Sequence, residues 1–400
     1  MDNPRQQGEL VFNHARVFDG VRTLGEVNVV VRGSLIAAVG SDEHASRDAT
    51  VFEARGMTLL PGLIDAHFHS LGESDALRQA AALGVTTVLD MGAAGKDLKN
   101  LKAASAQNAD LADVYGATWP AVASDAVLKK LPGLEEMPTI DNPEEATSWV
   151  DARIAEGSDF IKVIYDVREG GSMTEDTVGA IVSAAHSRGY QVWVHTLDEG
   201  SARKAVMAGV DGLAHLFVGD SAGGDFGELL AEHHVGVVPT LVVLLNALVG
   251  ESQMEPMLAD ERLKPFIDVK TLHPFPSRPR PNLRKGMSEA MKQISASHVP
   301  ILAGTDAAPS ITGLPWGTTL HRELELLVKE GMTPVQALAA ATSTTAQVFH
   351  LADRGYIRPG LRADLLLVEG DPTSKIDSTR NIVGVWKAGL RIPAGVLGEG

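Results

Sequence analysis

The stretch Pro61–Ser70, PGLIDAHFHS, decides how the rest of the chain is interpreted. Its apolar first half indicates a buried β-strand, and this strand ends in two histidines two positions apart. Side chains at i and i+2 of a strand point to the same face, so His67 and His69 can converge on one ligand. Because imidazole is the commonest metal ligand, the pair suggests a divalent cation at the carboxyl end of the strand. Two polar loop histidines that bind nothing are the alternative.

The composition is typical of a globular protein with a large buried core, since 44% of the 400 residues are hydrophobic and 22% are charged. The net charge, 35 basic minus 51 acidic residues, is −16. Such a charge disfavours binding to nucleic acid or to anionic lipid, so we expect a small-molecule substrate. The chain has no cysteine, which excludes disulfides, cysteine-ligated metals and a thiol nucleophile.

Neither a secretory signal nor a membrane span is expected. The first residues, MDNPRQQGEL, lack a basic start followed by an apolar core. The longest apolar run, residues 235–250, is interrupted by Pro239, Thr240 and Asn246 and is shorter than the roughly 20 residues that span a bilayer. A cytoplasmic location is therefore expected.

Short β-rich segments lie at both ends of the chain, over Glu9–Ala54 and Ala363–Pro393. We predict that they build one small β-sandwich from residues 1–60 and 351–400. In residues 61–350, apolar strands alternate with helical patterns, which predicts an α/β domain with a parallel sheet. Closed on itself, this sheet is a (β/α)8 TIM barrel. A doubly wound open sheet is the alternative, although no G-x-G-x-x-G follows a strand.

The eight expected barrel strands are Leu63–His67, Thr86–Met91, Ala112–Thr118, Asp159–Tyr165, Gln191–His195, Gly212–His215, Val235–Leu241 and Pro300–Gly304. The clearest helices between them are Ser74–Leu83, Pro143–Glu156, Thr174–Arg188 and Leu283–Ser297. The long segment Glu251–Pro281 is expected to be a lid or binding loop, or else an ordered surface excursion.

Polar residues lie at the ends of five of the predicted strands: His67, His69, Lys162, His195, His215 and Asp306. Taken singly, each histidine could be a hydrogen-bonded core residue and the lysine a solvated edge charge. An unpartnered polar group inside an apolar strand is costly, however. The active site of a TIM barrel lies where its strands end, so one shared site explains all six residues together.

These motifs resemble a known family. PGLIDAHFH, the strand lysine Lys162, VHT, AHL and AGTDAA, in this order, are similar to the amidohydrolase superfamily, the metal-dependent TIM-barrel hydrolases. The segment LHRELELLVKEGMTPVQALAAATSTTAQVFHLADRGYIRPGLRADLLLVEGDP resembles the imidazolonepropionase-like and Xaa-Pro-dipeptidase-like branch. The resemblance covers nearly the whole chain.

The resemblance implies a binuclear metal centre. In this sequence, His67, His69 and Asp306 match the ligands of one ion, and His195 and His215 match those of the other. Zinc is the expected metal, with manganese or cobalt as alternatives.

The resemblance also implies the roles of two residues. Lys162 matches a lysine that is carboxylated on its amine and bridges the two ions. This is chemically reasonable, because a buried lysine has a lowered pKa and a neutral amine can capture carbon dioxide. A metal-bridging hydroxide would attack an amide-type C–N bond in a dipeptide, N-acyl amino acid or cyclic amide. Asp306 would act as the general acid and base.

Other functions remain open on the same residues. A lactonase or phosphotriesterase-like hydrolase would use the same centre, and a non-catalytic oligomeric scaffold would not need it. We also expect a homo-oligomer. Candidate substrate contacts are Tyr115, Tyr165, His273 and Trp316. Basic residues that could recognise a substrate carboxylate are Arg278, Arg280, Arg284 and Lys285.

Overall fold

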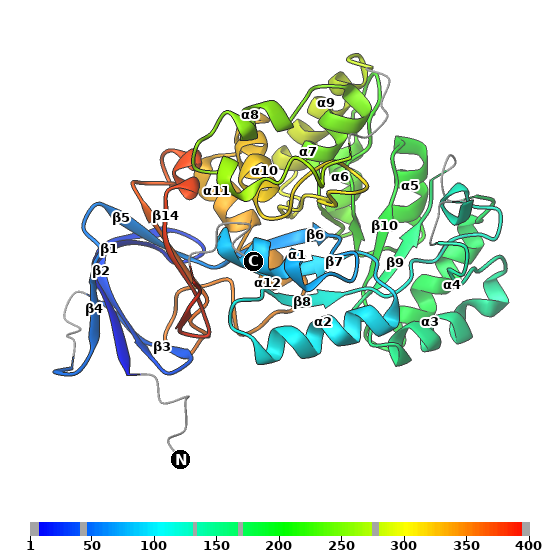
Figure 1. Cartoon of the computed structure of the whole chain (residues 1–400). Coiled ribbons are helices and arrows are strands. Elements are labelled where there is room, and N and C mark those ends of the chain that lie inside the picture. The colour runs from blue at the N-terminus through cyan, green and yellow to red at the C-terminus, as the bar shows by residue number, and fades with distance from the viewer. Residues whose placement is uncertain (1–7, 41–45, 131–133, 167–170, 274–279, 394–400) are drawn as a thin grey trace.

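The computed structural model describes residues 8–40, 46–130, 134–166, 171–273 and 280–393. Strands from both ends of the chain lie together at one side of the molecule, and an α/β body forms the rest (Figure 1). None of the described helices is long and apolar enough to cross a membrane.

The terminal sheet contains strands from both termini, as the sequence predicts. Its order is β15-β14-β13-β5-β1-β2-β3, and β4 pairs with β1. The two ends of the chain meet where β13 runs antiparallel to β5. The sequence predicts a sandwich of two sheets, whereas the hydrogen bonds define one mixed sheet. The domain boundaries stay a prediction. The strands are β1 (Glu9–Phe18), β2 (Thr23–Arg32), β3 (Leu35–Gly40), β4 (Thr50–Glu53), β5 (Met57–Pro61), β13 (Leu365–Glu369), β14 (Ile382–Lys387) and β15 (Leu390–Arg391).

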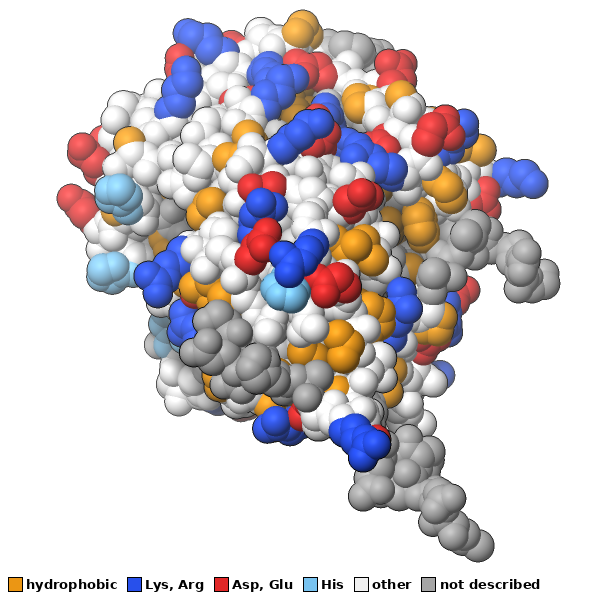
Figure 2. Space-filling model, turned by 90° about the vertical axis from the view of Figure 1, so that its left-hand side faces the viewer, with side chains coloured by type: hydrophobic (Ala, Val, Ile, Leu, Met, Phe, Trp, Pro, Cys, Tyr) orange, Lys and Arg blue, Asp and Glu red, His pale blue; other side chains and the backbone are white. Residues whose placement is uncertain are grey.

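The terminal sheet has its own apolar core, built by the alternation of inward and outward side chains. Phe12 and Trp386, which come from opposite ends of the chain, pack edge to face with ring centroids 4.8 Å apart. The outer surface at this side of the molecule carries basic and acidic side chains interspersed with single hydrophobic ones (Figure 2).

The α/β body contains two parallel sheets, one of order β6-β7-β8 and one of order β12-β11-β10-β9. Parallel bridges continue the pairing beyond the sheet edges, between Phe68 and Ala307, Ala121 and Val163, and Val237 and Ile301. This confirms the parallel α/β architecture and is the pattern that the predicted barrel requires. The strands are β6 (Leu63–Phe68), β7 (Val85–Asp90), β8 (Asp113–Gly116), β9 (Ile161–Ile164), β10 (Val192–His195), β11 (Gly212–Leu213) and β12 (Gly236–Val237).

Helices follow the strands and cover the sheets (Figure 1). The α-helices are α1 (Ser74–Ala82), α2 (Gly95–Gln107), α3 (Ala146–Ala155), α4 (Glu175–His186), α5 (Glu199–Met207), α6 (Phe226–Glu232), α7 (Leu241–Val243), α8 (Met254–Leu258), α9 (Leu283–Ala296), α10 (Thr318–Lys329), α11 (Pro334–Ala340) and α12 (Ser343–Val348). Single 3-10 turns are η1 (Val127–Lys130), η2 (Pro143–Glu145), η4 (Lys264–Phe266) and η5 (Ile376–Arg380), and η3 (Leu244–Val249) is a π-helix.

Two expected strands are shorter than predicted. The seventh, expected over Val235–Leu241, is the two-residue β12, because Thr240 adopts a left-handed conformation with φ of 48° and α7 begins directly after it. The eighth, expected over Pro300–Gly304, pairs through the single bridge at Ile301.

The segment Glu251–Pro281 is anchored along its first half. Arg284 forms ion pairs with Glu251 and with Glu330, and Arg380 lies 3.0 Å from Asp260. This half is therefore an ordered excursion that contains α8 and η4. Residues 274–279 lie outside the described part of the chain.

Candidate metal centre

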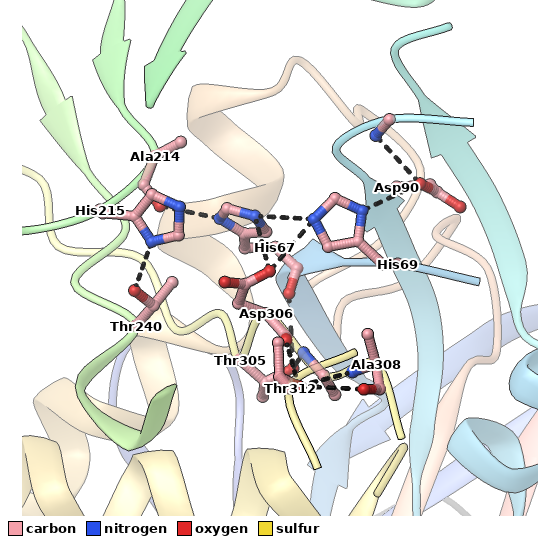
Figure 3. A network of polar contacts seen from close by, with 12 residues as sticks. His67, His69, Asp90, Ala214, His215, Thr240, Thr305, Asp306, Ala308 and Thr312 are labelled. Atoms are coloured by element: carbon pink, nitrogen blue, oxygen red, sulfur yellow. Dashed lines mark hydrogen bonds and ion pairs between the residues drawn. The ribbon is translucent and has the colours of Figure 1, made fainter. Parts of the chain in front are cut away.

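His67 and His69 come from the end of β6, as the sequence predicts, and their rings meet. The Nδ1 of His67 lies 2.8 Å from the carbonyl oxygen of Ala214. Because a carbonyl can only accept, Nδ1 is the protonated nitrogen and Nε2 keeps its lone pair. This Nε2 lies 3.3 Å from His69 Nε2 (Figure 3). The buried ring is thus held in the tautomer that suits a metal ligand.

Asp306 faces both rings from the loop after the eighth strand. Its Oδ1 lies 3.4 Å from His67 Nε2 and 3.1 Å from His69 Nε2. The residue has a left-handed backbone with φ of 56°, and its amide donates to the carbonyl of His67 at 2.7 Å. Thr312 Oγ1 donates to the Asp306 carbonyl at 3.2 Å. These bonds hold a conformation that is uncommon for residues other than glycine.

His195 and His215 extend the cluster from the ends of β10 and β11. The His215 ring lies 4.6 Å from the His67 ring and 4.5 Å from the His195 ring, measured between centroids. His215 Nδ1 lies 2.8 Å from Thr240 Oγ1. One ligand atom each from His67, His215 and Asp306 lies within 4.8 Å of the other two. This spacing suits a metal ion.

Lys162 is the unusual member of the cluster. It lies on β9 with only 4% of its surface exposed. Within the described part of the chain, its Nζ has no hydrogen-bond partner. Burial lowers the pKa of this amine to about 7, against the opposing effect of the Asp306 charge. A buried amine that is only partly protonated at neutral pH and has no described partner is accounted for if a further group binds beside it.

The comparison with known proteins decides the family. The family model described as "Amidohydrolase family" matches residues 58–392. The chain belongs to the amidohydrolase family. It is a hydrolase that acts on carbon–nitrogen bonds. Amidohydrolases generally use metal ions, and the convergence of His67, His215 and Asp306 fits that chemistry.

Two of the three similar proteins described next match almost the whole amidohydrolase chain. The imidazolonepropionase of Deinococcus deserti is 24% identical over 418 aligned residues, which cover 92% of each chain. The enamidase of Eubacterium barkeri is 31% identical over 186 residues, which cover 42% of this chain and 44% of that protein. Among solved structures, a Xaa-Pro dipeptidase with methionine in its active site has a TM-score of 0.78 at 24% identity, covering 96% of this chain and 99% of that one.

The protonation of the histidines in this amidohydrolase differs from ring to ring. Burial, followed by the charges of Lys162 and of neighbouring histidines, holds the pKa of His67 and His215 well below the ordinary value. Burial also lowers the pKa of His69, but the hydrogen bond and charge of Asp306 outweigh burial and raise it overall. His67 and His215 are therefore neutral, which is the form that binds a metal.

Two buried carboxylates support the cluster, and sequence reasoning missed both. Asp65 accepts from Thr305 Oγ1 at 2.7 Å and from the amides of Thr305 and His67 at 3.1 Å each, although burial raises its pKa to about 7. Asp65 thus joins β6 to the loop that carries Asp306. Asp90, at the end of β7, accepts from Ser70 and lies 3.9 Å from His69 Nδ1. Its position at a strand end was the available signal.

Three candidate substrate contacts line two cavities, and the described lining of these cavities contains no residue of the histidine cluster. Tyr165 follows β9, and its amide donates to the carbonyl of His195 at 3.0 Å. It lines a cavity of about 490 Å³ with Asp166. Trp316 Nε1 donates to the carbonyl of His69 at 2.9 Å. Trp316 and His273 line a second cavity of about 700 Å³.

Tyr115 lies elsewhere. The Arg354 guanidinium sits 5.4 Å from the centre of the Tyr115 ring. Both residues line a cavity of about 830 Å³ with Lys387 of β14 and with Gly33, which lies in the turn between β2 and β3 of the terminal sheet. The structure therefore corrects the prediction: Tyr115 faces the junction with the terminal sheet and not the histidine cluster.

The basic residues proposed to recognise a carboxylate are only partly placed. Arg284 is occupied by Glu251 and Glu330, and Lys285 lies 3.6 Å from Glu289. Arg280 is exposed. Arg278 lies outside the described residues.

Proposed function

We propose that this amidohydrolase is a binuclear metal-dependent enzyme that cleaves an amide-type C–N bond in a small molecule. The observation that carries the proposal is the Lys162 amine, which is buried close enough to the Asp306 carboxylate and to His67, His69 and His215 to act on their charges, and which has no hydrogen-bond partner among the described residues. A cluster built for one ion would need no lysine there, since an ammonium group repels a cation.

The proposed ligand sets follow the contacts in the cluster. His67, His69 and Asp306 would hold one ion, because their atoms converge within 3.4 Å. His195 and His215, whose rings touch, would hold the second. Lys162 would bridge the two sets after carboxylation. Its neutral amine adds to carbon dioxide and releases a proton, which turns an unfavourable cation into an anionic ligand.

When bound, two divalent ions, for which we propose zinc, would polarise the substrate carbonyl and lower the pKa of the attacking water. Asp306 would accept the proton that the water loses as its oxygen bonds to the carbonyl carbon. The same carboxyl would then deliver this proton to the nitrogen as the C–N bond breaks. Asp65 keeps Asp306 in place through its two bonds to Thr305. Trp316 and Tyr165 would wall the substrate.

The proposed substrates are dipeptides, N-acyl amino acids and cyclic amides. Support comes from the relatives, among them an imidazolonepropionase, an enamidase and a Xaa-Pro dipeptidase. Lactones and phosphotriesters are the alternative, because the same chemistry attacks esters and phosphoryl centres.

A hydrolysis screen with the zinc-loaded protein tests the proposal. Dipeptides, N-acyl amino acids, cyclic amides, lactones and organophosphates are offered in parallel, with Lys162→Ala as the inactive control. Metal-dependent turnover of an amide that Lys162→Ala lacks is the expected result. Turnover of lactones or organophosphates alone would replace the amide proposal, and hydrolysis that survives in Lys162→Ala would contradict the role of Lys162.

A further inference from the structure

Glu323 is a buried carboxylate on α10 that no step of the proposed reaction uses. Its Oε1 accepts from the amide of Leu241 at 2.9 Å, and its Oε2 accepts from the amide of Val242 at 2.8 Å. These are the first amides of α7, and the first amides of a helix have no acceptor within it. Glu323 therefore caps α7 from a helix that lies about 80 residues further along the chain.

Thr240 lies immediately before this cap, in a conformation that must be held. Its φ of 48° is left-handed, which is rare for a β-branched residue. The two peptide groups that follow Thr240 are the ones fixed by Glu323. The Glu323 carboxyl group therefore holds the backbone directly after Thr240, since each of its oxygens accepts from one of the first two α7 amides.

On its other side, Thr240 touches the histidine cluster. Its Oγ1 lies 2.8 Å from Nδ1 of His215 (Figure 3). A hydrogen bond at Nδ1 fixes the rotation of the imidazole and leaves Nε2 as the nitrogen available to a metal. Thr240 is itself fully buried, so no water can take its place without a rearrangement.

We infer that Glu323 is a positioning residue that sets the orientation and tautomer of His215 through Thr240. The inference rests on the proposed role of His215 as a metal ligand. According to this inference, Glu323 on α10 influences how tightly the ion at His215 is bound. The described hydrogen bonds of its carboxyl group go to the amides of Leu241 and Val242 and not to His215. A plain helix cap would stabilise α7 and leave metal affinity unchanged.

The same helix supplies a matched control. Glu325 also carries a carboxylate on α10, but it pairs with Arg322 and Arg380, each at 2.6 Å. Glu325→Gln makes the same change from carboxyl to amide on the same helix without touching the α7 amides. Thr240→Ser keeps the hydroxyl that His215 uses, whereas Thr240→Val removes it at nearly equal volume.

The test titrates chelator against the zinc-loaded full chain and measures the zinc retained by each variant. Glu323→Gln and Thr240→Val should each release one of the two ions at about 10- to 100-fold lower chelator concentration. Glu325→Gln and Thr240→Ser should release zinc as the wild type does. The double variant Glu323→Gln/Thr240→Val should be no weaker than Thr240→Val alone, because both changes act through one contact.

A second measurement is independent of metal. Nitrogen-15 spectra of histidine in the metal-free chain should show a changed tautomer signal for His215 in Glu323→Gln but not in Glu325→Gln. Glu323→Asp, which keeps the carboxyl group but shortens its reach, replaces Glu323→Gln if that variant does not fold. It should show the same selective zinc loss.

Three results would overturn the inference: wild-type zinc retention in the Glu323 variant, strictly additive losses in the double variant, or an unchanged His215 signal. If the proposed function fails instead, the wild type itself holds no zinc. The histidine spectra of the metal-free chain then still test whether Glu323 orients His215.

Discussion

The Nε2 atoms of His67 and His69 lie 3.3 Å apart, and Oδ1 of Asp306 lies within 3.4 Å of both. His67 Nδ1 carries its proton toward the carbonyl of Ala214, so Nε2 presents a lone pair to its neighbours. Two ring nitrogens and a carboxylate that converge in this way repel one another unless a proton or a cation lies between them. A proton on His69 Nε2, whose pKa Asp306 raises, or a bound metal ion would satisfy this arrangement.

Asp306→Asn should lower kcat/KM by about 100- to 10,000-fold, which is the usual contribution of a general acid and base. The amide keeps the shape of the side chain but cannot take a proton from water or return it to the leaving nitrogen. Kinetics are to be normalised to bound zinc, so that lost metal is not counted as lost proton transfer. Unchanged kcat/KM per bound zinc would show that Asp306 moves no proton.

His233→Ala is the control for this measurement. His233 is exposed at the end of α6, so its replacement should leave kcat/KM nearly unchanged.

Lys162→Ala should abolish activity and release the bridged pair of ions. The variant removes the amine that would carry the carboxylate, and the cavity it leaves can admit a small acid. Acetate or propionate should therefore restore part of the activity. The wild type, exposed to carbon-13 bicarbonate, should show a carbamate signal that Lys162→Ala lacks. Full activity in the variant, or no carbamate in the active wild type, contradicts the bridging role.

Asp113→Asn should lower the free energy of unfolding by about 2–4 kcal/mol, because it leaves buried cations without their shared carboxylate. Burial raises the pKa of Asp113, but Arg362, Arg354 and Lys387 outweigh burial and lower it to about 2. The folded pKa lies below the unfolded value. The stabilisation is therefore present above about pH 4 and is lost as the pH falls from 4 to 2, and it amounts to roughly 2 kcal/mol.

Urea denaturation at pH 7 and at pH 3 measures this effect. The difference between wild type and Asp113→Asn should be larger at pH 7. Asp151→Asn is the control, since Asp151 pairs with Arg188 at the surface and should leave the unfolding midpoint nearly unchanged. An equal difference at both pH values would show that the cluster around Asp113 does not depend on its charge.

The sequence was sufficient to predict the parallel α/β architecture, although two strands are shorter than expected, and to predict that the histidines lie close together, because the carboxyl ends of parallel strands meet at one edge. His67, His195 and His215 follow apolar runs whose burial is visible in the residues alone. The contacts that orient these rings were not predictable. Glu323 reaches α7 from 82 residues away, and Thr240 turns left-handed inside a valine-rich run that favours a strand.

Tyr115 shows why a position near a strand end is not enough. Successive side chains of a strand point to opposite faces, so nearness to a strand end does not show which face a side chain lies on. Tyr115 lies inside β8, one residue before its end at Gly116. Its ring packs against Arg354.

The central claim, a binuclear centre bridged by carboxylated Lys162, is tested most directly by the zinc content of the full chain after loading with zinc and bicarbonate. Elemental analysis should return two ions per wild-type chain. A content of one ion, or of none, under saturating zinc would contradict the account.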